Sequence, residues 1–157
     1  MTTIRASSFL RRVLVVDALA SAASGIAMIA FAEVLADLLQ LPVDLVSEAG
    51  IVLLPFAAFV GFVASRSEPA RFAVWAIIGL NILWVVDSIL LLFSGWVAPN
   101  ALGYAVVIAQ AAGILVLADL EYMGYRKSRP LVRQCPAGFP RAKLRSVAQP
   151  LGHQAEA

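Results

Sequence analysis

The chain contains polar groups inside one of its most apolar segments. The run NILWVVDSILLLF, residues 81–93, carries Asn81, Trp84, Asp87 and Ser88 among aliphatic side chains. On a helix, Asn81, Trp84 and Ser88 share one face, and Asp87 lies about 60° around the axis from Trp84. An amide, an indole N–H and a carboxyl group in hydrocarbon each need a partner. We therefore expect this face to point into a helix bundle, where it would hold helices together or bind a ligand.

Gln110 is the expected partner of Asn81. Counted from the ends of their segments, the two amides reach nearly the same depth. A hydrogen bond between them would join two antiparallel neighbouring helices. We therefore expect these amides to stabilise helix packing, in preference to forming a binding site.

A second polar stripe begins at Asp17. It continues through Ser21 and Ser24, and the small pairs Ser21/Gly25 and Ala109/Gly113 predict close helix packing. Asp17 is near the start of its segment and is expected to snorkel to the interface or to pair with an arginine.

The last apolar segment has two acids near its C-terminal end, Asp119 and Glu121. They too are expected to snorkel to the interface or to form an ion pair, here with Arg126. The candidate intramembrane polar site thus comprises Asp17, Asn81, Trp84, Asp87, Ser88 and Gln110. Phe56, Phe59 and Phe62 are expected to pack against lipid or core, the alternative being a groove shared with Trp84.

The residues needed for most redox and metal chemistry are scarce. The chain has one histidine, His153, and one cysteine, Cys135. Haem and metal sites need several such ligands at matched positions, and a dithiol relay needs a second sulfur. We predict no catalytic residues, no metal site and no cofactor, and no nucleic-acid partner is expected.

The elements that position these residues follow from hydropathy. Hydrophobic residues make up 61% of the 157 residues and charged residues only 14%. About 20 apolar residues span the hydrocarbon of a bilayer, and lipid forces them into helices because it offers the backbone no hydrogen-bond partner. The prediction is an all-α, polytopic membrane protein, a four-helix bundle over residues 1–125 with helices at about 13–35, 49–65, 72–93 and 101–123.

Two other interpretations of these segments have less support. A soluble helical core is disfavoured because these segments are apolar on nearly all sides and keep charge to their ends. A cleaved secretory signal at the first segment is disfavoured because Asp17 interrupts its apolar core and the apolar run continues past the small-residue site.

Charge predicts the orientation. All 12 Lys and Arg residues precede the first segment, flank the SRSEPAR turn or follow the last segment. The positive-inside rule then puts both termini in the cytoplasm, in a bacterial inner membrane. The connection EVLADLLQLPVDLVSE, rich in acids, falls on the outer side, where its pattern predicts a short interfacial helix.

The C-terminal segment, residues 126–157, changes character. It is basic and rich in proline, with no apolar helical stripe, which predicts a disordered cytoplasmic tail. The tail would bind anionic lipid headgroups or serve only to set the topology.

The helix layout, with the opening DALASAASGIAMIAFAEVLADLLQLP, the following AGIVLLPFAAFV and a basic tail, resembles small DoxX-like bacterial inner-membrane proteins. The resemblance implies an integral membrane protein, in some cases associated with respiratory or redox complexes.

Three functions are compatible with such a bundle. The favoured hypothesis is a non-catalytic subunit, assembly or interaction factor, in a homo-oligomer or membrane complex. The alternative is a small oligomeric proton- or cation-coupled transporter using Asp87. A quinone-holding accessory protein is the third.

Overall fold

A computed structural model describes residues 3–130. Four of its helices are long and apolar enough to cross a bilayer, which confirms the predicted all-α membrane bundle. Most of the predicted disordered tail lies outside the described residues. The elements, in chain order, are β1 (Ile4–Arg5), α1 (Ser8–Ala30), α2 (Ala32–Leu39), α3 (Val43–Ser65), α4 (Arg71–Phe93), α5 (Ala101–Lys127) and β2 (Arg129–Pro130).

The long helices expose apolar residues to the outside. Within an apolar stretch of 18 residues in each long helix, the share of residues buried inside the protein runs from 17% in α5 to 33% in α3. Contiguous apolar surface of this extent is unfavourable in water and favourable in lipid. The chain is therefore a multi-pass membrane protein.

The helix ends differ from the predicted ones. α1 begins at Ser8, because the Ser7 hydroxyl accepts a hydrogen bond from the Leu10 amide at 3.1 Å and caps the helix. It ends at Ala30, where Phe31 leaves the helical conformation (φ −121°, ψ 27°). The residues that follow form α2, so the predicted short helix exists, whereas a single first helix to residue 35 was wrong.

α3 and α5 are longer than predicted. α3 already begins at Val43 after Pro42, and α5 continues to Lys127. The Asn100 side chain caps α5 by accepting from the Gly103 amide at 2.8 Å.

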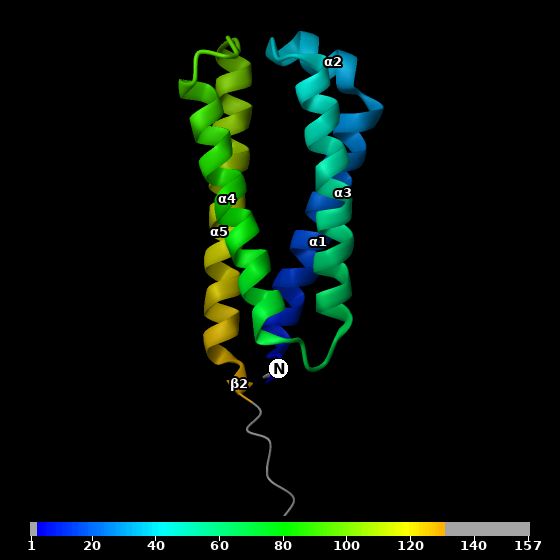
Figure 1. Cartoon of the computed structure of the whole chain (residues 1–157), viewed down its shortest axis with the longest axis vertical. Coiled ribbons are helices and arrows are strands. Elements are labelled where there is room, and N and C mark those ends of the chain that lie inside the picture. Colours follow the sequence, from blue (N-terminus) through cyan, green and yellow to red (C-terminus); the bar gives the residue numbers. More distant parts are fainter. Residues whose placement is uncertain (1–2, 131–157) are drawn as a thin grey trace, which may run out of the picture.

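The long helices pair into two hairpins. α1 packs mainly on α3, α4 packs mainly on α5, and α3 barely touches α4. In Figure 1 the two pairs converge at the end that holds the N-terminus and β2, and they stand apart toward α2.

Glycines allow the α1/α3 hairpin to pack closely. A Cβ on Gly50 would lie 2.9 Å from the Gly25 carbonyl oxygen, so two backbones meet there without side chains between them. The predicted close packing at Gly25 is confirmed. At Gly113 it is wrong, because nothing lies within 4 Å of a Cβ built there.

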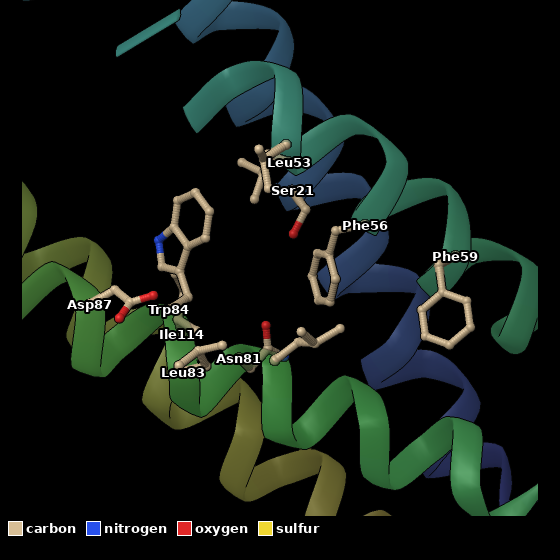
Figure 2. A pocket seen from close by; sticks show the side chains of 11 residues that line it. Ser21, Leu53, Phe56, Phe59, Asn81, Leu83, Trp84, Asp87 and Ile114 are labelled. Atoms are coloured by element: carbon tan, nitrogen blue, oxygen red, sulfur yellow. The ribbon is translucent and has the colours of Figure 1, made fainter. Parts of the chain in front are cut away.

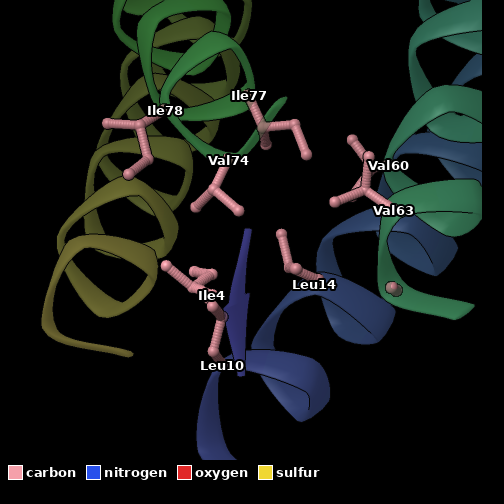
Figure 3. Packing of buried hydrophobic residues seen from close by; sticks show 9 residues of the cluster. Ile4, Leu10, Leu14, Val60, Val63, Val74, Ile77 and Ile78 are labelled. Carbon is pink, nitrogen blue, oxygen red and sulfur yellow. The ribbon is translucent and has the colours of Figure 1, made fainter. Parts of the chain in front are cut away.

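An apolar core joins the two hairpins at the end that holds the N-terminus and β2. Leu14 of α1, Val60 of α3 and Ile77 of α4 are almost fully buried and meet there (Figure 3). β1 closes this end by pairing with β2, and the Ile4 amide donates to the Pro69 carbonyl at 3.1 Å. The full cluster comprises Ile4, Leu10, Leu14, Val60, Val63, Ala64, Val74, Ile77 and Ile78.

A smaller contact joins the hairpins at the other end. The Asn100 side chain donates to the Leu38 carbonyl at 2.8 Å, and its backbone amide donates to the Leu39 carbonyl at 3.3 Å. A Cβ on Gly103 would collide with the Leu39 carbonyl, so glycine permits this approach of α5 to α2. The hairpins are thus joined at both ends of the molecule.

Gly50→Ala should lower the free energy of unfolding by about 1 to 3 kcal/mol, because the added methyl overpacks the α1/α3 contact. Gly113→Ala is the matched control and should raise it by about 0.5 to 1 kcal/mol through helix propensity. Reversible unfolding in mixed micelles measures both. Equal effects of the two substitutions would contradict the close contact between α1 and α3.

Candidate intramembrane binding site

Two adjoining cavities lie between the hairpins. The first has a volume of about 450 Å³ and draws its lining from α1, α3, α4 and α5. The second, toward α2, has a volume of about 330 Å³. Both volumes fall within the range of about 300 to 1,000 Å³ that is usual for small-molecule sites. Trp84 and Asp87 border both cavities, and Figure 2 shows the first of them.

Most of the lining is apolar. Leu53, Phe56 and Phe59 of α3 face Leu80 and Leu83 of α4 across the first cavity. Phe56 and Phe59 therefore line a groove with Trp84, which was the alternative to simple lipid or core packing. Such a lining suits an acyl chain or an aromatic ring.

Trp84 presents a hydrogen-bond donor without a partner. Its ring projects from α4 into the space between α4 and α3 (Figure 2). The indole Nε1 is buried, and no acceptor in the described chain reaches it. A buried, unpaired N–H is unfavourable by about 1 to 3 kcal/mol, so an acceptor on a bound molecule would stabilise the site.

Asp87 lies almost one turn further along α4. Its side chain is exposed and borders the two cavities. A carboxylate beside Trp84 and the phenylalanine rings can pair with an organic cation, which the ring faces also attract. The polar end of this site therefore combines an acid with an unpaired donor.

The remaining predicted site residues divide between the two cavities and a buried cluster. Ser88 donates to the Trp84 carbonyl at 2.8 Å and borders the second cavity. Gln110 also lines the second cavity. The predicted hydrogen bond from Asn81 to Gln110 is wrong, because the Asn81 amide is engaged elsewhere.

Asn81 joins two carboxyl groups from two other helices. Its Nδ2 donates to Asp17 Oδ2 at 3.3 Å and to Glu121 Oε2 at 3.2 Å, and the Ser21 hydroxyl donates to Asp17 Oδ1 at 3.3 Å. Asp17, Asn81 and Glu121 are 2%, 3% and 0% exposed. We call Asp17, Ser21, Asn81 and Glu121 the acid–amide cluster.

The acid–amide cluster overturns the expected role of two acids. Asp17 and Glu121 were expected to snorkel or to form ion pairs at helix ends, and both are buried in the interior. Because α1 begins at Ser8, Asp17 lies about 13 Å along the helix axis from its first residue. Asp119, by contrast, is exposed.

A sequence signal for this burial exists in the spacing. Arg12 is five residues before Asp17, and Arg126 is five after Glu121, whereas side chains on one helix meet at spacings of three or four. Neither acid therefore has a cation on its own helix face.

Two arginines at the starts of α1 and α4 contact other groups. Arg11 Nε donates to the Ala64 carbonyl at 3.1 Å, and Arg71 Nε donates to the Tyr125 hydroxyl at 2.9 Å.

The acid–amide cluster borders the first cavity. Ser21 and Asn81 contribute to its lining, and their side-chain oxygens point toward the cavity from opposite sides (Figure 2). Within residues 3–130, no group of three or more His, Cys, Asp or Glu side chains is placed to hold a metal ion.

No protein-family model, no curated protein and no solved structure matches this chain.

Asn81→Leu should destabilise the protein by at least about 1.5 to 3 kcal/mol, because it leaves two buried carboxyl groups without their shared donor. Gln110→Leu likewise replaces an amide with leucine, at the second cavity, and should alter the stability by less than about 0.5 kcal/mol. Unfolding in mixed micelles again gives both values. Similar losses in the two variants would favour an Asn81–Gln110 pair and contradict the acid–amide cluster.

Proposed function

We propose that the protein is a non-catalytic integral membrane protein that acts as a binding or interaction factor through its polar intramembrane residues. The partner proposed for these residues is a small amphipathic molecule with a cationic amine and an oxygen acceptor next to an apolar tail. The observation that carries this proposal is that Trp84 and Asp87, one an unpaired donor and one an acid, border both cavities.

The chemistry of the lining supports this class of ligand. An ammonium group would pair with the Asp87 carboxylate, an oxygen acceptor would receive the Trp84 N–H, and the Asn81 oxygen offers a further acceptor. The tail would lie against Leu53, Phe56 and neighbouring apolar side chains. Phospholipid headgroups with an amine and long-chain amino alcohols both have these features.

Docking of another protein through the same residues has less support. Asn81 and Asp17 are hydrogen-bonded within the chain, so they have little to offer to a partner helix. Association with a second copy or with another membrane protein would use the apolar outer faces of the helices.

The proposed location is a bacterial inner membrane with both termini in the cytoplasm. Arg11, Arg12 and Arg71 belong to the end where the hairpins converge, and Glu33 and Asp37 of α2 belong to the opposite end (Figure 1). This separation of charge supports the orientation through the positive-inside rule. Membership among DoxX-like proteins would agree with such a location.

A proton- or cation-coupled transporter is the second candidate. One observation favours it: Asp87 borders both cavities, so a substrate in either of them would meet the same carboxylate. In that case Asp87→Asn should abolish ion-driven uptake in proteoliposomes while leaving the fold intact.

Calorimetry on the purified protein in nanodiscs should distinguish a long-chain amino alcohol from the same alcohol without the amine. Asp87→Asn should weaken binding of the amine at least about tenfold, because a charge-assisted hydrogen bond contributes about 1.5 to 3 kcal/mol. Binding of the plain alcohol should not change. Trp84→Phe should weaken both probes by a smaller factor.

Asp119→Asn is the matched control, since Asp119 is an exposed acid that lines neither cavity. Equal affinities of wild type for the two probes, or equal effects of Asp87→Asn and Asp119→Asn, would remove the support for an amine site.

Reporter fusions test the orientation independently of any ligand. Fusions after Glu68 and Arg129 should report the cytoplasm, and fusions after Asp44 and Pro99 should report the outer side, because basic residues concentrate at the first two positions. A fusion after Arg129 that reports the outer side would contradict a cytoplasmic C-terminus.

A further inference from the structure

The acid–amide cluster contains more acceptors than its donors can satisfy. Asn81 Nδ2 has two hydrogens and gives one to each carboxyl group, while Ser21 gives its hydrogen to Asp17. Glu121 is fully buried, and its Oε1 atom has no partner in the described chain. One buried acceptor is therefore left over.

Within residues 3–130, no basic side chain hydrogen-bonds to either acid. α1 contributes Asp17 and Ser21 to the cluster, α4 contributes Asn81, and α5 contributes Glu121. α3 lines the cavity next to the cluster with Leu53 and Phe56, and its residues 49–65 include no charged side chain. Two buried carboxylates in contact and without a counter-charge would be strongly unfavourable, because each loses its hydration and each repels the other.

We propose that Asp17 and Glu121 form a proton-binding site in which the two carboxyl groups share one exchangeable proton. The two carboxyl groups meet at one nitrogen, because Asn81 Nδ2 lies 3.3 Å from Asp17 Oδ2 and 3.2 Å from Glu121 Oε2. In the occupied state, Glu121 Oε1 bears the proton and donates it to an Asp17 carboxylate oxygen. This bond supplies the missing partner of Oε1 and leaves one negative charge, which Asn81 and Ser21 stabilise.

The first cavity gives the proton a route. Ser21 and Asn81 belong both to the acid–amide cluster and to the cavity lining, so water that enters the cavity reaches hydrogen-bonding distance of the cluster. On release, the proton moves to water and both carboxyl groups become anionic.

The proton links the two hairpins. Asp17 belongs to the α1/α3 hairpin, and Asn81 and Glu121 belong to the α4/α5 hairpin. Proton release should place like charges across the joint, so that the hairpins separate and the cavities widen. This inference does not depend on which molecule occupies the cavities.

Infrared spectroscopy of the carboxyl C=O band detects the shared proton directly. Wild-type protein in nanodiscs at neutral pH should show a protonated-carboxyl band that disappears at alkaline pH. Glu121→Gln and Asp17→Asn should each lose the band at neutral pH, because the remaining acid is then ionised and receives amide donors. Absence of the band from the wild type, or its persistence in Glu121→Gln, would overturn the proposal.

Two exposed acids serve as controls for the same measurement. Asp119→Asn changes an acid on the same helix as Glu121, and Asp87→Asn changes the acid at the cavities. Both should keep the band. Loss of the band in Asp119→Asn would assign the proton to another acid and would also overturn the proposal.

Pulsed electron paramagnetic resonance tests the link to the hairpins. Spin labels at Ile51 of α3 and Leu90 of α4, both exposed, in a Cys135→Ser background report the separation of the hairpins. The distance should increase at alkaline pH in the wild type. In Glu121→Gln, whose amide imitates the protonated acid, it should stay at the short value at every pH.

A distance that does not respond to pH in the wild type, or that responds equally in Glu121→Gln, would contradict the coupling.

Repeating the series with choline in place of sodium distinguishes a proton from a sodium ion as the ligand. A distance that follows sodium at constant pH would replace the proton with sodium as the ligand and overturn the proposal.

Discussion

The hydrogen bonds from the Asn81 amide to Asp17 and Glu121 determine how the two hairpins face each other. In lipid, burial of apolar surface does not distinguish one helix face from another, since the acyl chains are as apolar as leucine. The long helices of this chain are apolar on nearly all sides. Their arrangement therefore depends on the fit of packed side chains, on close approach at small residues and on polar contacts. The acid–amide cluster is the polar contact that joins α1, α4 and α5.

The cavities follow from the same arrangement. The hairpins are joined at one end by the apolar core and the acid–amide cluster, and at the other end by Asn100 with the C-terminus of α2. α3 and α4 barely touch between these joints. The chain fills the intervening space incompletely, and the donor of Trp84 is left without a partner there. Unfilled space and an unpaired buried donor, in a fold that is otherwise well packed, are typical of a functional site.

Hydropathy predicted the four spanning helices, and the charge pattern predicted the short helix after the first, because both depend on local composition. The polar face of residues 81–88 was also predicted, since helical periodicity determines which side chains share a side. Periodicity does not determine which helix lies opposite. Asn81 was assigned to Gln110 on the assumption of equal depth between neighbours in the chain, whereas its contacts include the more distant α1. The pairing of β1 with β2 is too short to leave a pattern.

The burial of Asp17 and Glu121 was missed for a different physical reason. An acid near a helix end can reach water if it faces outward. The spacing of five residues from Arg12 or Arg126 argues against an ion pair on the same helix face, but it does not say which neighbouring helix each acid faces. In α5, Gly124 determines the direction that Glu121 faces. A Cβ at Gly124 would lie 2.9 Å from Leu10 Cα, so α5 crosses α1 closely there. This crossing turns Glu121, one turn earlier, toward α1 and α4, where it is buried. Asp87 has no such crossing beside it and is exposed at the cavities. The two kinds of acid therefore suit different ligands: a buried pair that one proton can bridge, and a single exposed carboxylate at the cavities that can meet a larger cation.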